Sequence, residues 1–123
     1  MARDFRKILA WQKADELVYE IYLATKQFFP KEELFGLTSQ IRRAAVSVAA
    51  NIAEGSGRQT QAEFLRFLGY SEGSLSEVEY YLHLANRLGY LPDETFEHLE
   101  ALRAETGRTL NGLVKAVRKR ATS

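Results

Sequence analysis

The chain has 123 residues and a formal net charge of +1, with 46% hydrophobic and 27% charged residues. This length and composition are ordinary for one globular domain that can bury a core, and they exclude disordered and collagen-like chains. Because the chain has no cysteine, disulfide frameworks and thiolate metal sites are also excluded.

Four segments carry the 3.6-residue periodicity of amphipathic helices. We predict helices over residues 9–29, 37–54, 61–88 and 92–120, separated by Pro30, by Gly55–Gly57 and by Pro92. In the first segment, apolar positions from Trp11 to Phe28 recur at spacings of three and four, which places them on one helix face.

The other three segments contain signals for helix ends. Gly55 is expected at the C′ position that ends the second helix. Thr60 and Glu63 form a capping-box pattern that begins the third helix, because their side chains can satisfy free N–H groups. Pro92 suits the first turn of the fourth helix, and the basic residues from Lys115 onward complement its negative end.

Short links between four helices favour antiparallel neighbours. No segment shows the strict alternation of a strand that would compete with this reading. The predicted fold is therefore all-α, an antiparallel up-down-up-down four-helix bundle formed by residues 1–123 as a single domain.

Small residues on the second and third helices indicate close packing. Ala45, Ala49 and Ala53 are spaced by four, as are Gly69 and Gly73. A glycine inside a helix costs about 1 kcal/mol relative to alanine, so two on one face require a compensating gain. We expect the second helix to lie against the Gly69–Gly73 face of the third, although glycines merely tolerated on a wet surface are the alternative.

Apolar residues also occupy a second face of the first and third helices. A helix of a monomeric bundle shows one polar face, and a second apolar stripe usually indicates a partner surface. We therefore predict a homo-oligomer, with a broad core stripe and scattered surface aromatics as the alternative. The expected interface residues are Tyr22, Phe67, Tyr70, Tyr81, Leu84 and Leu88.

Positive charge is concentrated near the C-terminus. After Glu105 the chain has five basic residues and no acidic residue. Repeated around an oligomer, such patches would bind the phosphate backbone of RNA or DNA without reading its sequence. The alternative is that the arginines pair with acids between helices and that the tail only complements the helix dipole. The candidate nucleic-acid-binding residues are Arg42, Arg43, Arg58, Arg66, Lys115, Arg118, Lys119 and Arg120.

Signals for catalysis and metal binding are weak. The chain lacks a phosphate loop, a dinucleotide fingerprint and the Glu-x-x-His motif of di-iron bundles. Glu79 precedes His83 by four residues and Glu94 precedes His98 by four, and we interpret both pairs as surface ion pairs rather than metal ligands. We expect no enzyme activity, no metal and no cofactor.

Asn51 is a polar residue on the apolar stripe of the second helix. It could join a network with Glu54 and Arg58, or with Ser74 on the third helix. A hydrogen-bonded Asn that fixes helix register explains it better than a catalytic role.

The sequence also resembles the bacterial four-helix bundle family first recognised in intervening sequences within 23S rRNA genes. The resemblance covers nearly the whole chain, with Leu37–Arg58 as its most specific block. It implies an antiparallel bundle, a ring-like homopentamer, and kinship with retroelement accessory proteins that bind nucleic acid and a reverse transcriptase. The motifs that carry it are Trp11–Ala14, Phe29–Pro30, Phe35–Ala44, Asn51–Arg58, Glu63–Leu68 and Gly73–Leu75.

The basic N-terminal stretch leads into no apolar run with a cleavage site, and no stretch approaches the roughly 18 apolar residues of a membrane span. We therefore expect a cytoplasmic protein without a membrane partner. Its expected function is that of a non-enzymatic homo-oligomer that binds nucleic acid. The alternative is a structural or adaptor module that holds a protein partner and binds no nucleic acid.

Overall fold

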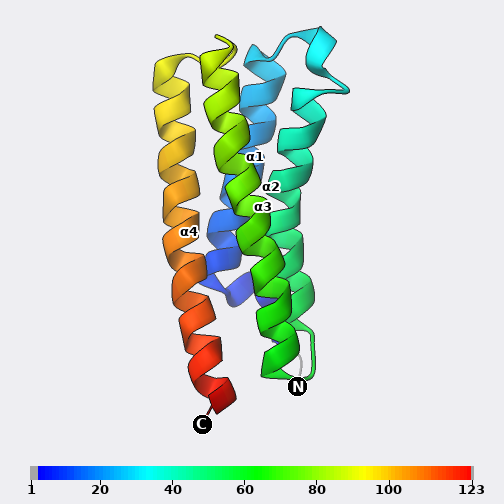
Figure 1. The fold of residues 1–123 in the computed structure, drawn as a ribbon, viewed down its shortest axis with the longest axis vertical. Coiled ribbons are helices and arrows are strands. Elements are labelled where there is room, and N and C mark those ends of the chain that lie inside the picture. The colour runs from blue at the N-terminus through cyan, green and yellow to red at the C-terminus, as the bar shows by residue number, and fades with distance from the viewer. Residues whose placement is uncertain (1–2, 123) are drawn as a thin grey trace.

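The computed structural model describes residues 3–122, and these form an antiparallel four-helix bundle (Figure 1). The long helices are α1 (Leu9–Phe28), α2 (Leu37–Ser56), α3 (Gln61–Arg87) and α4 (Asp93–Thr122). Two short 3₁₀ helices, η1 (Phe5–Lys7) and η2 (Lys31–Glu33), precede α1 and α2. The described residues contain no strand, so the predicted fold class is confirmed, and the helix ends differ from those expected by one or two residues.

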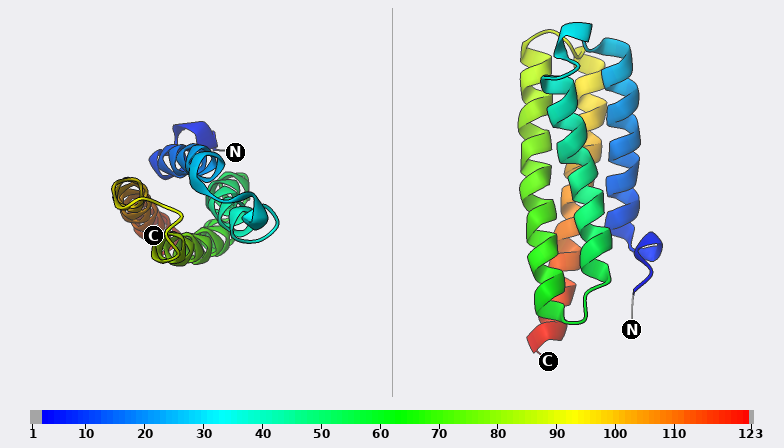
Figure 2. Two further views of the ribbon diagram at one scale, coloured as in Figure 1. Left: turned by 90° about the horizontal axis from the view of Figure 1, so that it is seen from above. Right: turned by 90° about the vertical axis from the view of Figure 1, so that its right-hand side faces the viewer.

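The core lies along the axis of the bundle, where one face of each helix turns inward and packs against its two neighbouring helices (Figure 2). Burying each large apolar side chain contributes roughly 1.5–3 kcal/mol, which is how helices of modest intrinsic stability are held together. The largest fully buried side chains are Leu17, Ile21, Ile41, Val48, Ile52, Phe64, Leu68, Val78, Leu82, Leu99, Leu110 and Val117.

The expected packing of α2 against the Gly69–Gly73 face of α3 is wrong. Both glycines are exposed, and a Cβ atom added at either would meet no heavy atom within 4 Å. The face of α3 that is turned toward α2 instead carries serines. The Ser71 hydroxyl, for example, donates a hydrogen bond of 2.8 Å to the buried carbonyl of Val48 on α2. At this level of the bundle, small polar side chains of α3, and not its two glycines, face α2.

The close backbone contact occurs at Gly55, near the end of α2. A Cβ atom there would lie 2.7 Å from the Cβ of Phe67 and 3.0 Å from a ring carbon of Phe64. Gly55 was expected to end the helix, but α2 continues through Ser56 and its C-cap is Gly57. The glycine is therefore required by packing against α3 and not by helix termination.

Side chains cap the starts of α2 and α3. The Thr60 hydroxyl accepts a hydrogen bond of 3.1 Å from the backbone N–H of Glu63, whereas the Glu63 carboxylate binds Arg66 instead of completing the capping box. At α2, the Glu33 carboxylate accepts hydrogen bonds from the Leu37 N–H and the Tyr90 hydroxyl, each 2.9 Å long. The Glu33 contact ties the α1–α2 link to the loop before α4.

We expect Glu33→Gln to lower stability at neutral pH. The Leu37 N–H, and then the Tyr90 hydroxyl, lower the pKa of Glu33 because both bonds favour its charged form. A depressed pKa contributes stability above the unfolded-state pKa, and this contribution is lost as the pH falls through the folded-state value. The difference in melting temperature between wild type and variant should therefore shrink on going from pH 7 to pH 3. A difference that stays constant over this range would contradict the assignment.

Among the described residues, no helix is both long and apolar enough to cross a membrane.

Candidate nucleic-acid interface

One end of the bundle gathers three segments that are distant in sequence. The N-terminal segment, the link between α2 and α3, and the C-terminal turns of α4 all lie at this end (Figure 1). We call this region the basic end, and it comprises residues 3–7, 57–66 and 115–122. Antiparallel packing brings these three segments together, because α2 ends, α3 begins and α4 ends at the same end of the bundle.

The C-terminal turns of α4 supply the densest positive charge of the basic end. Lys115, Arg118 and Lys119 are exposed, and within residues 3–122 none of them forms an ion pair or hydrogen bond through its side chain. Arg120 is also exposed. The last acidic residue of the helix, Glu105, is held 2.9 Å from Lys13 of α1, so it does not neutralise this stretch. Lys115, Arg118 and Lys119 are therefore free to meet an external anion.

Arg58 and Arg66 also lie at the basic end, but each is anchored. Arg58 forms an ion pair of 2.7 Å with Glu54 and lies over the ring of Phe67. Arg66 binds Glu63 at 3.0 Å, and this hydrogen bond raises the pKa of its guanidinium. Exposed pairs of this kind contribute about 0–1 kcal/mol, so an anion of higher charge density can compete for either arginine.

Arg3 is a residue of this region that the sequence pattern did not single out. Its guanidinium donates to the carbonyls of Ser56 and Arg58 at 3.1 and 3.3 Å, and to the side-chain oxygen of Gln61 at 2.9 Å. It also lies 4.6 Å above the Phe64 ring centroid. Arg3 therefore fastens the N-terminal segment across the α2–α3 link. Only its hydrogen-bond partners reveal this role, because nothing local in the sequence indicates which carbonyls would be near.

Arg42 and Arg43 lie near the opposite end of the bundle. They precede Arg58 by about 15 residues, or roughly 22 Å along a helix. The Nε of Arg42 donates a hydrogen bond of 2.9 Å to the Thr25 hydroxyl, and its guanidinium lies 4.5 Å above the Tyr22 ring centroid. Arg42 therefore joins α2 to α1. Arg43 is exposed and has no ion pair in the described part of the chain. The eight predicted residues thus do not form one site.

The expected interface residues divide between two surfaces. Tyr70 is exposed on α3, Tyr81 and Leu84 are half-buried there, and Leu88 is exposed at the C-cap of this helix. Tyr22 is exposed on α1. Phe67 must be removed from the expected interface, because it is only 7% exposed. Its ring is enclosed between Arg58, Arg66 and the glycine-bearing end of α2.

Comparison with known proteins identifies the family. The profile of the 23S rRNA-intervening sequence protein family matches residues 6–112, which is most of the chain. The chain belongs to this family.

A solved structure supports the same relationship. It is a protein of unknown function of the S23 ribosomal protein family from Bacteroides thetaiotaomicron. Its sequence is 27% identical to this one, and the two structures superpose with a TM-score of 0.80. The match spans 87% of this chain and 99% of the other chain. No curated protein sequence matches the chain. Neither the family description nor this structure assigns an enzymatic activity.

Within residues 3–122, no three His, Asp or Glu side chains lie close enough together to hold a metal ion. The predicted ion pairs Glu79–His83 and Glu94–His98 are wrong, because Glu79 and His98 each have a different partner. His98 lies 3.1 Å from Glu20 on α1, and Glu79 lies 3.4 Å from Arg103 on α4. Contacts between helices replace contacts within one helix, because these faces lie beside a neighbouring helix.

Asn51 is hydrogen-bonded within the bundle, as predicted. Its amide donates 2.9 Å bonds to the carbonyl and the hydroxyl of Ser47, and that hydroxyl accepts a 2.8 Å bond from Ser74. The link from Asn51 to Ser74 thus runs through Ser47, while Glu54 and Arg58 pair with each other. This short polar chain fixes the register of α2 on α3.

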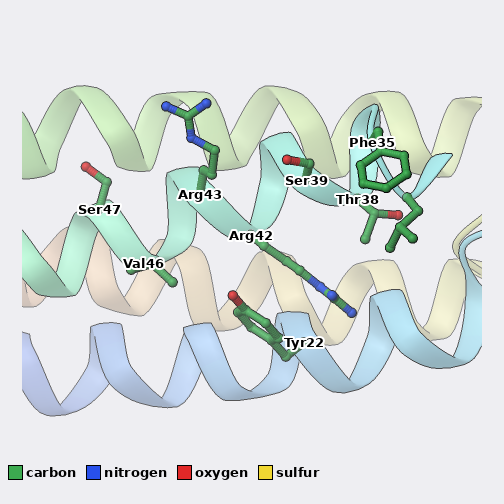
Figure 3. A pocket seen from close by; sticks show the side chains of 9 residues that line it. Tyr22, Phe35, Thr38, Ser39, Arg42, Arg43, Val46 and Ser47 are labelled. Carbon is green, nitrogen blue, oxygen red and sulfur yellow. The ribbon is translucent and has the colours of Figure 1, made fainter.

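A separate hollow of about 660 Å³ opens between α1 and α2, away from the basic end (Figure 3). Figure 3 shows Arg42 reaching across from α2 to the ring of Tyr22, with Arg43 pointing to the other side of the helix. Phe35 closes one end and is 92% exposed, the highest value among the large hydrophobic residues described. Tyr22, Leu34 and Val46 line the same hollow and are also exposed. A contiguous apolar patch of this kind is typical of a contact surface.

Proposed function

We propose that this protein is a non-enzymatic homo-oligomer that binds the phosphate backbone of nucleic acid through its basic end. The observation that carries the proposal is the group of unpaired cations at Lys115, Arg118 and Lys119, on a stretch with no acidic residue. Kinship with the 23S rRNA-intervening sequence proteins supports a cytoplasmic role close to nucleic acid and, as the resemblance implies, a homopentamer.

The geometry supports backbone contacts over base readout. The three side chains lie at spacings of three and four, so they share one exposed side of α4 and can follow a row of phosphates. No Phe, Tyr or Trp that could stack on a base occurs in residues 97–123. Arg58, Arg66 and Arg3 lie at the same end and would extend the positive surface. Arg66 is part of α3, whereas Arg58 lies in the α2–α3 link and Arg3 precedes η1.

Salt dependence tests the proposal. Fluorescence anisotropy with a labelled 30-base-pair duplex and with a structured RNA should show binding at 50 mM salt. Because phosphate contacts release counterions, six to ten such contacts would weaken binding by about 10³–10⁵-fold at 200 mM. Absence of binding to both probes at 50 mM would overturn nucleic-acid binding and favour the adaptor function instead.

A further inference from the structure

We infer that the hollow between α1 and α2 is the docking site for α3 of a second copy of this chain. This inference rests on the homo-oligomer of the proposed function and names its contact surfaces. The hollow continues into a second one of about 350 Å³, with Leu34, Thr38 and Arg42 lining both. Together they form one groove along the α1–α2 face.

The groove selects an acidic occupant with apolar or aromatic side chains. Its cationic lining is Lys26, Lys31 and Arg42, and none of the lining residues is acidic. Arg43 also borders it, but its guanidinium points to the other side of α2. Its apolar part is supplied by residues such as Leu34 and Phe35, which the single chain leaves exposed. A rod-shaped ligand fits best, because the groove follows the direction of two helices (Figure 3).

The outer face of α3 has this chemistry. Residues 67–86 contain three glutamates and no lysine or arginine. Glu72 and Glu77 form no ion pair among the described residues, and Tyr70 and Tyr80 are also exposed on this helix. Between Arg66 and Arg87, which lie at its two ends, the charge of this stretch is therefore opposite to that of the groove. Arg66 donates a 2.8 Å hydrogen bond to the Tyr70 hydroxyl, so the acidic part of the stretch follows Tyr70.

The exposed glycines provide the shape. Gly69 and Gly73 lie one helical turn apart on this outer face, and nothing in the same chain covers them. Without side chains of their own, they leave open space on this face against which the Phe35 ring of another copy can pack. A close approach between copies accounts for two helix-interior glycines that no contact within the chain explains.

The contact pairs two different surfaces, the groove on α1 and α2 and the ridge on α3. Such a head-to-tail contact leaves one free groove and one free ridge on every dimer, and repetition closes into a ring when the rotation permits. Tyr22 in the groove and Tyr70 on the ridge then belong to the same interface, although they lie on separate surfaces of one subunit.

Sedimentation analysis of point variants tests the assignment. Wild type should sediment as an oligomer, whereas Phe35→Ala and Gly73→Leu should each shift the mass toward the 14.0 kDa chain at micromolar concentration. Neither change should unfold the subunit, because both sites are exposed and leucine is the better helix former. Gly112→Leu is the matched control, since Gly112 on α4 is also uncovered, and it should leave the oligomer intact.

Cross-linking identifies the occupant, because the chain has no cysteine of its own. A mixture of Phe35→Cys and Gly73→Cys chains should give a cross-linked dimer with a short bismaleimide. Two outcomes would overturn the inference. One is that Phe35→Cys chains cross-link to each other. The other is that Phe35→Cys cross-links to Tyr19→Cys, on the acidic side of α1, and not to Gly73→Cys. An oligomer unaffected by Phe35→Ala and Gly73→Leu would also overturn it. A monomeric wild type would instead refute the homo-oligomer of the proposed function itself, without bearing on nucleic-acid binding.

Discussion

Phe64→Ala is expected to lower the free energy of unfolding by about 3–5 kcal/mol, the usual cost of removing a buried phenyl ring. Phe64 is 1% exposed at the start of α3, against the backbone of Gly55 and beneath the guanidinium of Arg3. Alanine there leaves a cavity and also removes the cation–π contact of Arg3. The melting temperature should fall by roughly 10–20 °C at a fixed protein concentration.

Tyr80→Ala is the matched control for this change. Tyr80 is an aromatic residue of the same helix but is exposed, so its loss should change the free energy of unfolding by no more than about 0.5 kcal/mol. Urea unfolding followed by circular dichroism measures both variants. Equal effects of the two substitutions would show that the Phe64–Gly55 contact is not part of the core.

This contact also shows what the sequence could and could not predict. Helix number, order and approximate ends follow from periodicity, from two prolines and from Thr60, because these signals act within a few residues. The choice of which glycine meets a neighbouring helix depends on how α2 is rotated relative to α3. Gly55 and Gly73 look alike in sequence, yet Phe67 touches the position of one and nothing touches the other.

The candidate site shows the same limit. A run of basic residues without acids predicts an exposed positive stretch at Lys115–Arg120 correctly, since the charge is local. The roles of Arg3 and Arg42 could not be predicted in this way. Their partners are the carbonyls of Ser56 and Arg58 and the hydroxyl of Thr25, at separations of 17 to 55 residues. Only the assembled bundle brings such groups within hydrogen-bond distance.

Replacing Lys115, Arg118 and Lys119 together by glutamine is expected to weaken nucleic-acid binding by about 100-fold at 0.15 M salt. If each side chain neutralises one phosphate, the slope of log K against log salt should decrease in magnitude by about 2.7 for duplex DNA. The three residues are exposed and unpaired, so the fold and its melting temperature should be unchanged. Anisotropy titrations at four salt concentrations measure the affinity and the slope together.

The single variants Arg118→Gln and Arg87→Gln provide the control, because both remove one exposed positive charge. Arg87 ends α3 at the opposite end of the bundle from Arg118. A site at the basic end predicts that only Arg118→Gln changes the slope, by about 0.9. If both variants weaken binding equally, the nucleic acid responds to the total charge of the protein and not to the basic end. The slope decides between these cases better than the affinity at one salt concentration, since it counts the phosphates that each cation contacts.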